Sequence, residues 1–269
     1  MPTSIAHLTS RALIAIGGAD WRGFLQGLLT QDVETIQPDE VRFGALLTPQ
    51  GRLLYDLFIV GRPEPAPGGC WLDCVAERRA ALIQRLSIYR LRAKVTIAPD
   101  DTPVLAAWGD AAPVGPGWAP DPRLAALGWR GYGAAAEPNA AEADYERHRL
   151  ALGAPGPVDW GEDRAYPLEA DFDLLNGVDF QKGCFVGQET TSRMKRRGAI
   201  KSRMLPIAFD GPPPAAGSEI LAGTLRAGET LSGMDGRAIA LVRLDRIEGA
   251  RLTVDGRPCA VERPDWTRV

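Results

Sequence analysis

The chain has 269 residues, of which 45% are hydrophobic, and a formal net charge of −3. This length favours two domains over one, and the near balance of charge excludes a chain-wide positive field that would attract nucleic acid, although it leaves room for a local basic patch. No stretch is long enough for a transmembrane helix, and residues 1–10 resemble neither a secretory signal nor an Arg-rich leader, so we expect a cytoplasmic protein without membrane contact.

The four cysteines give no sign of a disulfide framework or a zinc site. Cys70 and Cys74 lie in a run predicted to be a strand, with Cα atoms roughly 13 Å apart, too far for a disulfide. We interpret both as core residues of a protein in a reducing compartment. Because the chain has only His7 and His148, we expect no preformed metal site, and cluster chemistry would need thiolates and a second protein.

The first half of the chain mixes strands and helices in an order typical of an α+β fold. Residues 11–16 predict a strand, Asp20 a helix N-cap, and residues 21–30 an amphipathic helix. The runs 42–47 and 52–60 flank a Pro-x-Gly turn and predict a β-hairpin. Within it, Asp56 is either a solvent-facing residue of the alternating pattern or an acid that projects into a pocket.

The remaining elements complete this arrangement. We expect strands at 70–75, 93–97, 104–108 and 124–133, and helices at 77–90 and 141–152. This order favours antiparallel sheets with helices on one face over a doubly wound parallel sheet. Residues 203–263 contain short strands with frequent turns, which predict a small antiparallel barrel. The expected domains are therefore residues 1–200 and 201–269.

The most unusual stretch is the octapeptide Lys182-Gly183-Cys184-Phe185-Val186-Gly187-Gln188-Glu189. Residues 190–197 lack Gly and Pro and predict a helix that ends at Gly198. Cys184 would then lie just before a helix N-terminus with Lys182 beside it, and both features favour a thiolate. The alternative is a tight loop with a buried, inert cysteine.

Charged segments flank this octapeptide on both sides. Residues 155–181 are irregular and rich in carboxylates, among them Glu169, which are either solvated or able to accept paired N–H donors such as those of a pterin ring. On the other side, residues 193–203 carry six cations and no acid. They form either a solvated basic face or an edge that binds an anion such as a polyglutamate tail, a phosphate or RNA.

The octapeptide, followed by Arg193, resembles the K-G-C-[YF]-x-G-Q-E signature of the YgfZ/Iba-type proteins. These are folate-binding relatives of the glycine-cleavage T-protein (aminomethyltransferase, GcvT-like) that are implicated in iron–sulfur protein maturation. Residues 24–33, 51–56, 89–95 and 167–169 also resemble this family. The resemblance implies a GcvT-like folate-binding domain of ferredoxin-like halves around a central hole, and a C-terminal antiparallel β-barrel.

The resemblance also implies functional residues. Tetrahydrofolate, or a derivative, would occupy the central pocket with its pterin on Glu169, and Asp56 corresponds loosely to the functional aspartate of the T-protein. Cys184 would offer one activated thiolate. The other residues expected at the folate site are those of the signature and its flank, namely Lys182, Gly183, Phe185, Gly187, Gln188, Glu189 and Arg193.

These expectations lead to a tetrahydrofolate-binding accessory factor in iron–sulfur cluster assembly or repair, with support of tRNA-modifying iron–sulfur enzymes as one role. Its expected partners are iron–sulfur carrier or client proteins. The alternative is a folate-dependent aminomethyl transferase that uses Asp56. Two departures from the T-protein count against the alternative: Cys184 stands where that protein has a K-G-D-F-type sequence, and the chain looks shorter. We do not expect direct nucleic-acid binding, since residues 193–203 lack interleaved aromatic residues.

Overall fold

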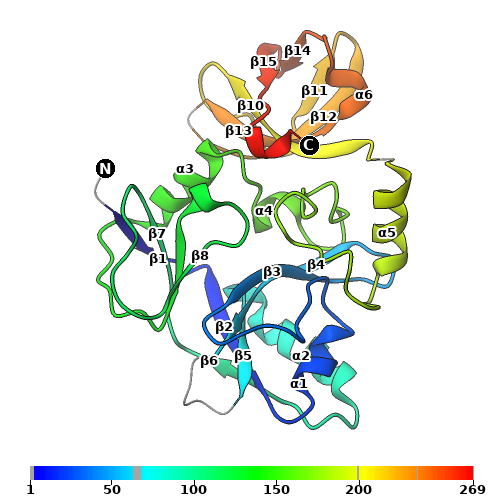
Figure 1. The fold of residues 1–269 in the computed structure, drawn as a ribbon. Coiled ribbons are helices and arrows are strands. Elements are labelled where there is room, and N and C mark those ends of the chain that lie inside the picture. The colour runs from blue at the N-terminus through cyan, green and yellow to red at the C-terminus, as the bar shows by residue number, and fades with distance from the viewer. Residues whose placement is uncertain (1–2, 63–67, 199, 235, 269) are drawn as a thin grey trace.

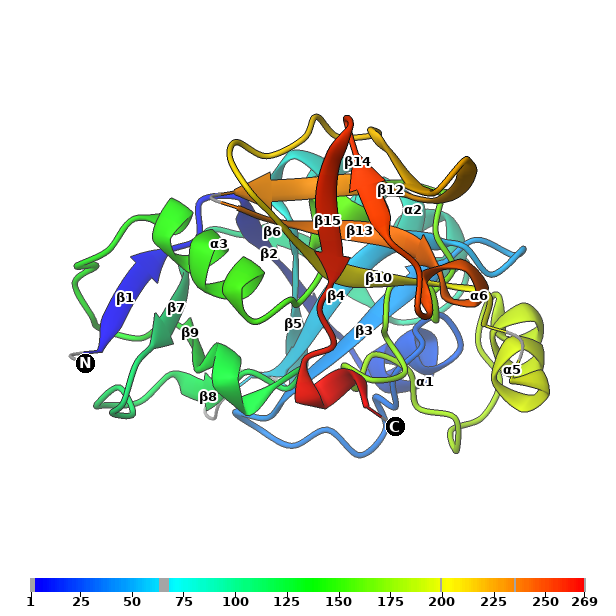
Figure 2. The same ribbon diagram turned by 90° about the horizontal axis from the view of Figure 1, so that it is seen from above.

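The computed structural model describes residues 3–62, 68–198, 200–234 and 236–268. The chain forms two antiparallel sheets and a closed barrel. Figure 1 shows the barrel packed across the end of the molecule that carries helices α3 (Glu142–Ala151) and α4 (Pro157–Trp160), and Figure 2 shows the molecule from above. This confirms the α+β class with a C-terminal barrel. Among the described residues, no helix combines the length and the apolar character needed to cross a membrane.

The first sheet has five antiparallel strands in the order β3-β4-β5-β2-β6. Helices α1 and α2 cover one of its faces, and alternating strand residues divide between this helical layer and the central core. On β4, for example, Leu57 and Ile59 pack toward the helices while Phe58 and Val60 pack toward the centre. The element bounds are Arg11–Gly17 (β2), Trp21–Gln26 (α1), Val41–Leu47 (β3), Leu53–Gly61 (β4), Gly69–Val75 (β5), Arg79–Arg90 (α2) and Thr96–Asp100 (β6).

The second sheet has four antiparallel strands in the order β1-β7-β9-β8. Its residues Ala106 and Tyr132 join the same central core as the inner face of the first sheet. The elements of this part and of the segment that follows are Ser4–His7 (β1), Val104–Trp108 (β7), Trp118–Pro120 (β8), Trp129–Tyr132 (β9), Glu142–Ala151 (α3), Pro157–Trp160 (α4) and Gln188–Arg197 (α5).

The barrel closes in the order β10-β13-β12-β11-β14-β15, with β15 pairing back onto β10. It has a hydrophobic core of its own, built from residues such as Ile207, Ile220 and Val242. Its elements are Ser202–Phe209 (β10), Glu219–Ala222 (β11), Leu225–Met234 (β12), Arg237–Arg243 (β13), Leu244–Ile247 (α6), Leu252–Val254 (β14) and Arg257–Val261 (β15).

Several local predictions differ from the structure. Helix α1 ends at Gln26 rather than at residue 30, and the following residues instead form turns and a bridge between Leu29 and Leu46. The side chain of Asp20 does not cap α1, because its Oδ2 accepts a hydrogen bond from the N–H of Lys94 at 2.8 Å. The strand expected at 93–97 lies at β6, three residues further on.

Candidate functional site

Lys182 holds the octapeptide loop against the end of helix α1. Its Nζ donates hydrogen bonds to three carbonyl oxygens, those of Gln26 (2.9 Å), Leu29 (2.7 Å) and Gln31 (2.7 Å). The carbonyls at the end of a helix have no partner within it, and an ammonium group complements their negative potential. The two stretches that carried the family resemblance, residues 24–33 and 182–189, are therefore in direct contact.

This position changes the role expected for Lys182. An ammonium group has three N–H donors, and all three are used by carbonyls at or just after the end of α1 rather than by Cys184. Burial lowers the pKa of Lys182 to about 8, although Asp32, Asp179 and Glu34 act in the opposite direction. Lys182 thus positions the loop, and the structure shows no contact through which it would activate the thiol.

Cys184 is exposed on this loop, so the alternative of a buried, inert cysteine is wrong. The next residue, Phe185, is buried in the central core at 8% exposure, which fixes the loop directly beside the thiol. Its N–H donates to Oε1 of Gln188 at 3.2 Å, and the N–H of Gln188 donates back to the carbonyl oxygen of Phe185 at 3.2 Å. Phe185 and Gln188 therefore stabilise the turn between Cys184 and α5.

Gly187 is the N-cap residue of α5, which begins at Gln188. It has φ of 82°, and a Cβ there would lie 2.5 Å from the carbonyl oxygen of Thr48, in the turn between β3 and β4. Gly183 is different, because a Cβ there would meet open space. Helix α5 ends at Gly198 in a left-handed conformation, as predicted.

The last two signature residues lie on α5. Glu189 and Arg193 form an i,i+4 ion pair at 4.0 Å, and their side chains are 92% and 49% exposed. Such an exposed pair contributes little to stability.

Glu169 lies in a separate loop between the central core and the barrel. It is partly buried, its Oε2 accepts a hydrogen bond from the N–H of Tyr166 at 3.0 Å, and its carbonyl oxygen accepts one from the N–H of Met204 on β10 at 2.8 Å. Its carboxylate is thus partly engaged in its own turn.

The sequence did not single out Asp171, two residues further on. Its Oδ1 accepts a hydrogen bond from Nη1 of Arg203 at 2.7 Å, while its Oδ2 is buried with no partner among the described residues. Burial raises the pKa of Asp171 to about 7 despite Arg203. Arg203 also bonds Asp173 through two nitrogens, each at 3.0 Å, so it joins this loop to the barrel. Arg203 therefore does not belong to the exposed basic run.

Asp56 is 5% exposed, so the solvent-facing interpretation is wrong. Its Oδ2 accepts a hydrogen bond from Nη1 of Arg11 at 2.7 Å, and Nε of the same arginine donates to Asp73 at 2.6 Å. Nη2 of Arg130 and the hydroxyl of Tyr132 also donate to Asp73, at 2.6 and 2.8 Å. Asp56 is thus one acid of a buried ionic network, in an environment separate from that of Cys184.

This central network links the two sheets. Burial acts to raise the pKa of Asp73, but the guanidinium groups of Arg11 and Arg130 hold it below its ordinary value. The guanidinium of Arg130 also lies 3.7 Å from the centroid of the Phe58 ring. The two acids could have been found from the sequence, since Asp73 interrupts an apolar strand as Asp56 does. Their arginine partners come from β2 and β9, and no local sequence pattern predicts that these strands meet the acids.

The cavity at the centre is small for a folate. The cavity that Asp56 lines measures about 50 Å³, and it is bordered by Arg11, Arg123, Arg130 and Arg149. Pockets for ligands of this size are usually about 300 Å³ or larger. The carboxylate of Asp56 is paired with Arg11, and Glu169 does not border this cavity. The structure therefore does not join Asp56 and Glu169 into one pterin site.

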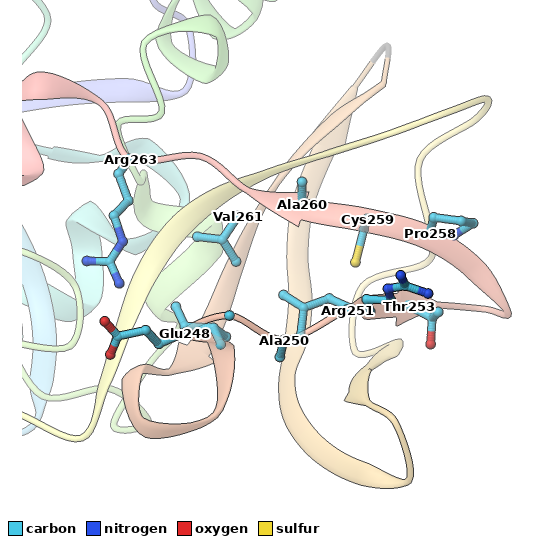
Figure 3. Close-up of a pocket in the computed structure, with 12 residues that line it drawn as sticks. Glu248, Ala250, Arg251, Thr253, Pro258, Cys259, Ala260, Val261 and Arg263 are labelled. Carbon is cyan, nitrogen blue, oxygen red and sulfur yellow. The ribbon is translucent and has the colours of Figure 1, made fainter.

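A larger cavity, of about 790 Å³, lies on the barrel. Figure 3 shows it between the loop that contains Glu248 and Arg251 and the strand that carries Cys259, whose sulfur points toward this loop. Burial raises the pKa of Cys259. No residue that the sequence assigned to the functional site lines this cavity.

The chain resembles curated proteins along almost its whole length. It is 32% identical to the iron–sulfur cluster assembly factor IBA57, mitochondrial, of Mus musculus, over 97% of this chain and 84% of the mouse protein. The Homo sapiens IBA57 protein is 33% identical over the same shares of the two chains. The chain belongs to the IBA57 family of iron–sulfur cluster assembly factors. This confirms the resemblance to the YgfZ/Iba-type proteins.

The fold comparisons agree with IBA57 membership. Residues 201–269 match the family model of the CAF17 C-terminal beta-barrel domain. The crystal structure of the glycine cleavage system aminomethyltransferase T from Bartonella henselae superposes with a TM-score of 0.73, over 98% of this chain and 86% of that one. Its sequence identity is 16%, so this likeness shows the GcvT-like fold and nothing more.

The cytoplasmic location expected from the sequence is contradicted by these relatives. The mouse and human IBA57 proteins, and a homologue in Mycosarcoma maydis, carry names that place them in mitochondria. The relatives therefore point to mitochondria rather than to the cytoplasm.

Proposed function

We propose that this IBA57-family chain acts in iron–sulfur cluster assembly by presenting Cys184 as a single thiolate ligand to a cluster whose other ligands come from a partner protein. The observation that carries the proposal is the geometry of the loop: Cys184 is exposed, while Lys182 and Phe185 on either side hold the backbone in place. A fixed, solvent-facing thiol can meet a partner without reorganising the fold.

The requirement for a partner follows from the number of thiols. Iron–sulfur clusters are usually held by four protein ligands. Of the four cysteines, Cys70 and Cys74 are buried in the first sheet, and burial raises the pKa of Cys74 to about 12. Cys259 lies on the barrel. This leaves Cys184 as the exposed thiol, so a carrier or client protein supplies the other ligands.

A complementation experiment tests this role. Cells that lack their own family member would be supplied with the wild type, Cys184→Ala or Cys259→Ala, and the activity of iron–sulfur enzymes would be measured, including tRNA-modifying ones as a client class. We expect Cys184→Ala to lose support and Cys259→Ala to keep it. Full support by Cys184→Ala would refute a ligand role for this thiol.

Tetrahydrofolate binding, with the pterin on Glu169, is a separate part of the proposal. It is supported by the family resemblance of the signature, whereas the cavity of about 50 Å³ and the Arg11–Asp56 pair count against it. Calorimetric titration of the wild type, Glu169→Ala and Cys184→Ala with tetrahydrofolate tests it. Binding that is lost only in Glu169→Ala supports the folate site. The absence of any heat of binding to the wild type would refute it.

The alternative of an aminomethyl transferase is less well supported. It requires the carboxylate of Asp56 to reach a folate amine, but this carboxylate is buried and bonded to Arg11 at 2.7 Å. Folate-dependent aminomethyl transfer that is abolished by Asp56→Asn and retained by Cys184→Ala would favour this alternative.

A further inference from the structure

Helix α5 presents arginines to solvent along one face. Arg193, Arg196 and Arg197 stand at positions i, i+3 and i+4, which share a helix face, and all three are exposed. We call these three residues the α5 basic face. Figures 1 and 2 both show α5 at an edge of the molecule, next to the start of the barrel.

The neighbouring cations of this run pair with acids outside α5, whereas the contacts of the α5 basic face lie within the helix. Among the described residues, they are the exposed Glu189–Arg193 pair and a hydrogen bond of 3.4 Å from Nε of Arg196 to the carbonyl oxygen of Ser192. Arg203 is bonded to Asp171 and Asp173, and Nζ of Lys195 lies 3.5 Å from Asp173. The opposite side of α5 is the packed side, where Thr191 is 1% exposed. Basic residues in the last turn interact favourably with the helix dipole, but each stabilises the helix by only about 0.3–1 kcal/mol. The stability of the helix therefore does not require three arginines here.

The α5 basic face and Cys184 lie within reach of one binding partner. Helix α5 begins four residues after Cys184, and its ten residues span roughly 15 Å. Phe180, before the signature, is 39% exposed and lies with its ring centroid 5.3 Å from Nζ of Lys195. A typical interface covers about 800 Å² on each partner, which is enough to include both the thiol and the arginines.

The chemistry of this surface favours an acidic protein over other anions. The arginines project from an open helix face and line none of the cavities described above, so they do not form a pocket for a small anion. Met194, which is partly buried, is the one apolar side chain of α5, so the helix lacks the apolar face with which an amphipathic helix enters a membrane. Phe180 is a single exposed aromatic residue, whereas single-stranded RNA is usually bound on a series of them.

We propose that the α5 basic face is the docking surface for an acidic face of the partner protein that brings iron–sulfur ligands to Cys184. The proposal rests on the function proposed above and adds the surface and its charge. The whole chain carries a net charge of −3, so the α5 basic face is a local positive patch on a weakly acidic molecule. Such local complementarity sets the orientation of an encounter and speeds association.

The test uses Cys184 as the reporter. An oligoglutamate peptide that ends in a cysteine activated as a 2-thiopyridyl disulfide is mixed with the full chain at low salt. The Cys184 thiolate attacks the peptide sulfur, a mixed disulfide forms, and 2-thiopyridone leaves with the electron pair and is measured by absorbance. An oligoglutamine peptide of equal length measures the rate without charge, and Cys184→Ser measures the background from other thiols.

We expect the acidic peptide to react about tenfold faster than the neutral one, and near-physiological salt to remove most of this difference. The combined substitution R193Q/R196Q/R197Q should lower the reaction rate of the acidic peptide to that of the neutral peptide. The matched control is R85Q/R90Q/R92Q, which removes the same charge from exposed arginines on and just after α2, and it should keep the acceleration.

Equal rates for the two peptides, or the same loss in both triple variants, would overturn the docking surface. Polyuridylate that binds the chain more tightly than oligoglutamate, and only when the α5 basic face is present, would assign the surface to RNA instead. If the peptides show no difference while Cys184→Ala still abolishes support of iron–sulfur enzymes, the docking surface is wrong and the assembly role stands.

Discussion

At the scale of single residues, the signature divides into an exposed cysteine and residues that hold the loop around it. Lys182, Phe185 and Gly187 each contact the body of the protein, through three carbonyls, the central core and the β3–β4 turn respectively. Cys184 and Gly183 face solvent. A sequence signature can therefore be specific because most of its members are needed to place one exposed group.

The first residue-scale prediction concerns Lys182→Met. The substitution keeps a long apolar stem but leaves the carbonyls of Gln26, Leu29 and Gln31 without their shared donor. We expect the free energy of unfolding to fall by about 2–4 kcal/mol, as is usual when several buried acceptors lose a charged donor. Denaturant unfolding measures this, and Lys201→Met, at an exposed position, should change it by no more than about 0.5 kcal/mol.

The two signature glycines offer a second prediction. Gly187→Ala forces φ of 82° on an alanine and brings its Cβ to 2.5 Å from a backbone oxygen, so we expect a loss of about 2 kcal/mol or more. Gly183→Ala places its Cβ in open space and should leave stability within about 0.5 kcal/mol of the wild type. Thermal unfolding of both variants decides this, and equal losses would contradict the assignment of the constraint to Gly187.

At the scale of elements, the acidic loop before the octapeptide joins the body to the barrel. The loop bonds β10 through the carbonyl oxygen of Glu169 and through the carboxylates of Asp171 and Asp173, which share Arg203. The carboxylate Oδ2 of Asp171 is buried without a partner among the described residues. The acidic loop, whose carboxylates the sequence leaves open as solvated, is therefore a structural junction, and burial disfavours the charged form of one of its acids, Asp171.

This junction predicts a pH dependence. The pKa of Asp171 is raised to about 7 in the folded chain from an ordinary 3.8, so the unfolded chain loses this proton first as the pH rises. The contribution of Asp171 to stability is therefore present below about pH 4 and is lost as the pH rises toward 7. At about 1.4 kcal/mol for each unit of pKa, the loss is on the order of a few kcal/mol.

Unfolding free energies measured from pH 4 to 7 test this dependence. The wild type should lose more stability across the range than Asp171→Asn, which cannot ionise. Asp210→Asn, at an exposed position on the barrel, serves as the control and should retain the wild-type slope. A slope that is unchanged in Asp171→Asn would show that this carboxyl does not hold a raised pKa.

At the scale of the whole molecule, a buried ionic network joins the two sheets. Arg11 on β2 and Arg130 on β9 meet at Asp73 on β5, so the network ties the first sheet to the second. A second set connects α3 to the barrel, because Arg149 pairs with Asp159 and Asp159 accepts a hydrogen bond from the N–H of Ser232. The GcvT-like fold is thus held at its centre by this chain's own charges.

Arg130→Met tests this role. The substitution removes the donor to Asp73 at 2.6 Å and to the hydroxyl of Tyr132 at 2.8 Å, and leaves a fully buried carboxylate with fewer partners. We expect a loss of about 3–5 kcal/mol in the free energy of unfolding, the usual cost of breaking a buried pair. Denaturant titration beside Arg251→Met, at an exposed barrel position, measures it, and equal small losses in both would contradict a stabilising network.

Much of the fold follows from local pattern. Three patterns predict elements that the structure contains: the two apolar runs 42–47 and 52–60 across a Pro-x-Gly turn, the Gly-terminated run at 190–197, and the short strands after residue 201. Helix α1 was predicted too long because its apolar periodicity continues past Gln26, whereas the chain there turns to contact β3 and Lys182. Periodicity reports burial, and both a helix and a packed turn can bury the same residues.

The sequence by itself determined the α+β class, the barrel and the family, because each depends on residues that are close together in the chain. Only the tertiary structure decided that Lys182 is committed to helix α1, that Asp56 is neutralised by Arg11, and that Arg203 leaves the basic run to bind Asp171 and Asp173. A charge's role depends on which opposite charge or carbonyl the fold brings to it, and those partners lie up to 156 residues away.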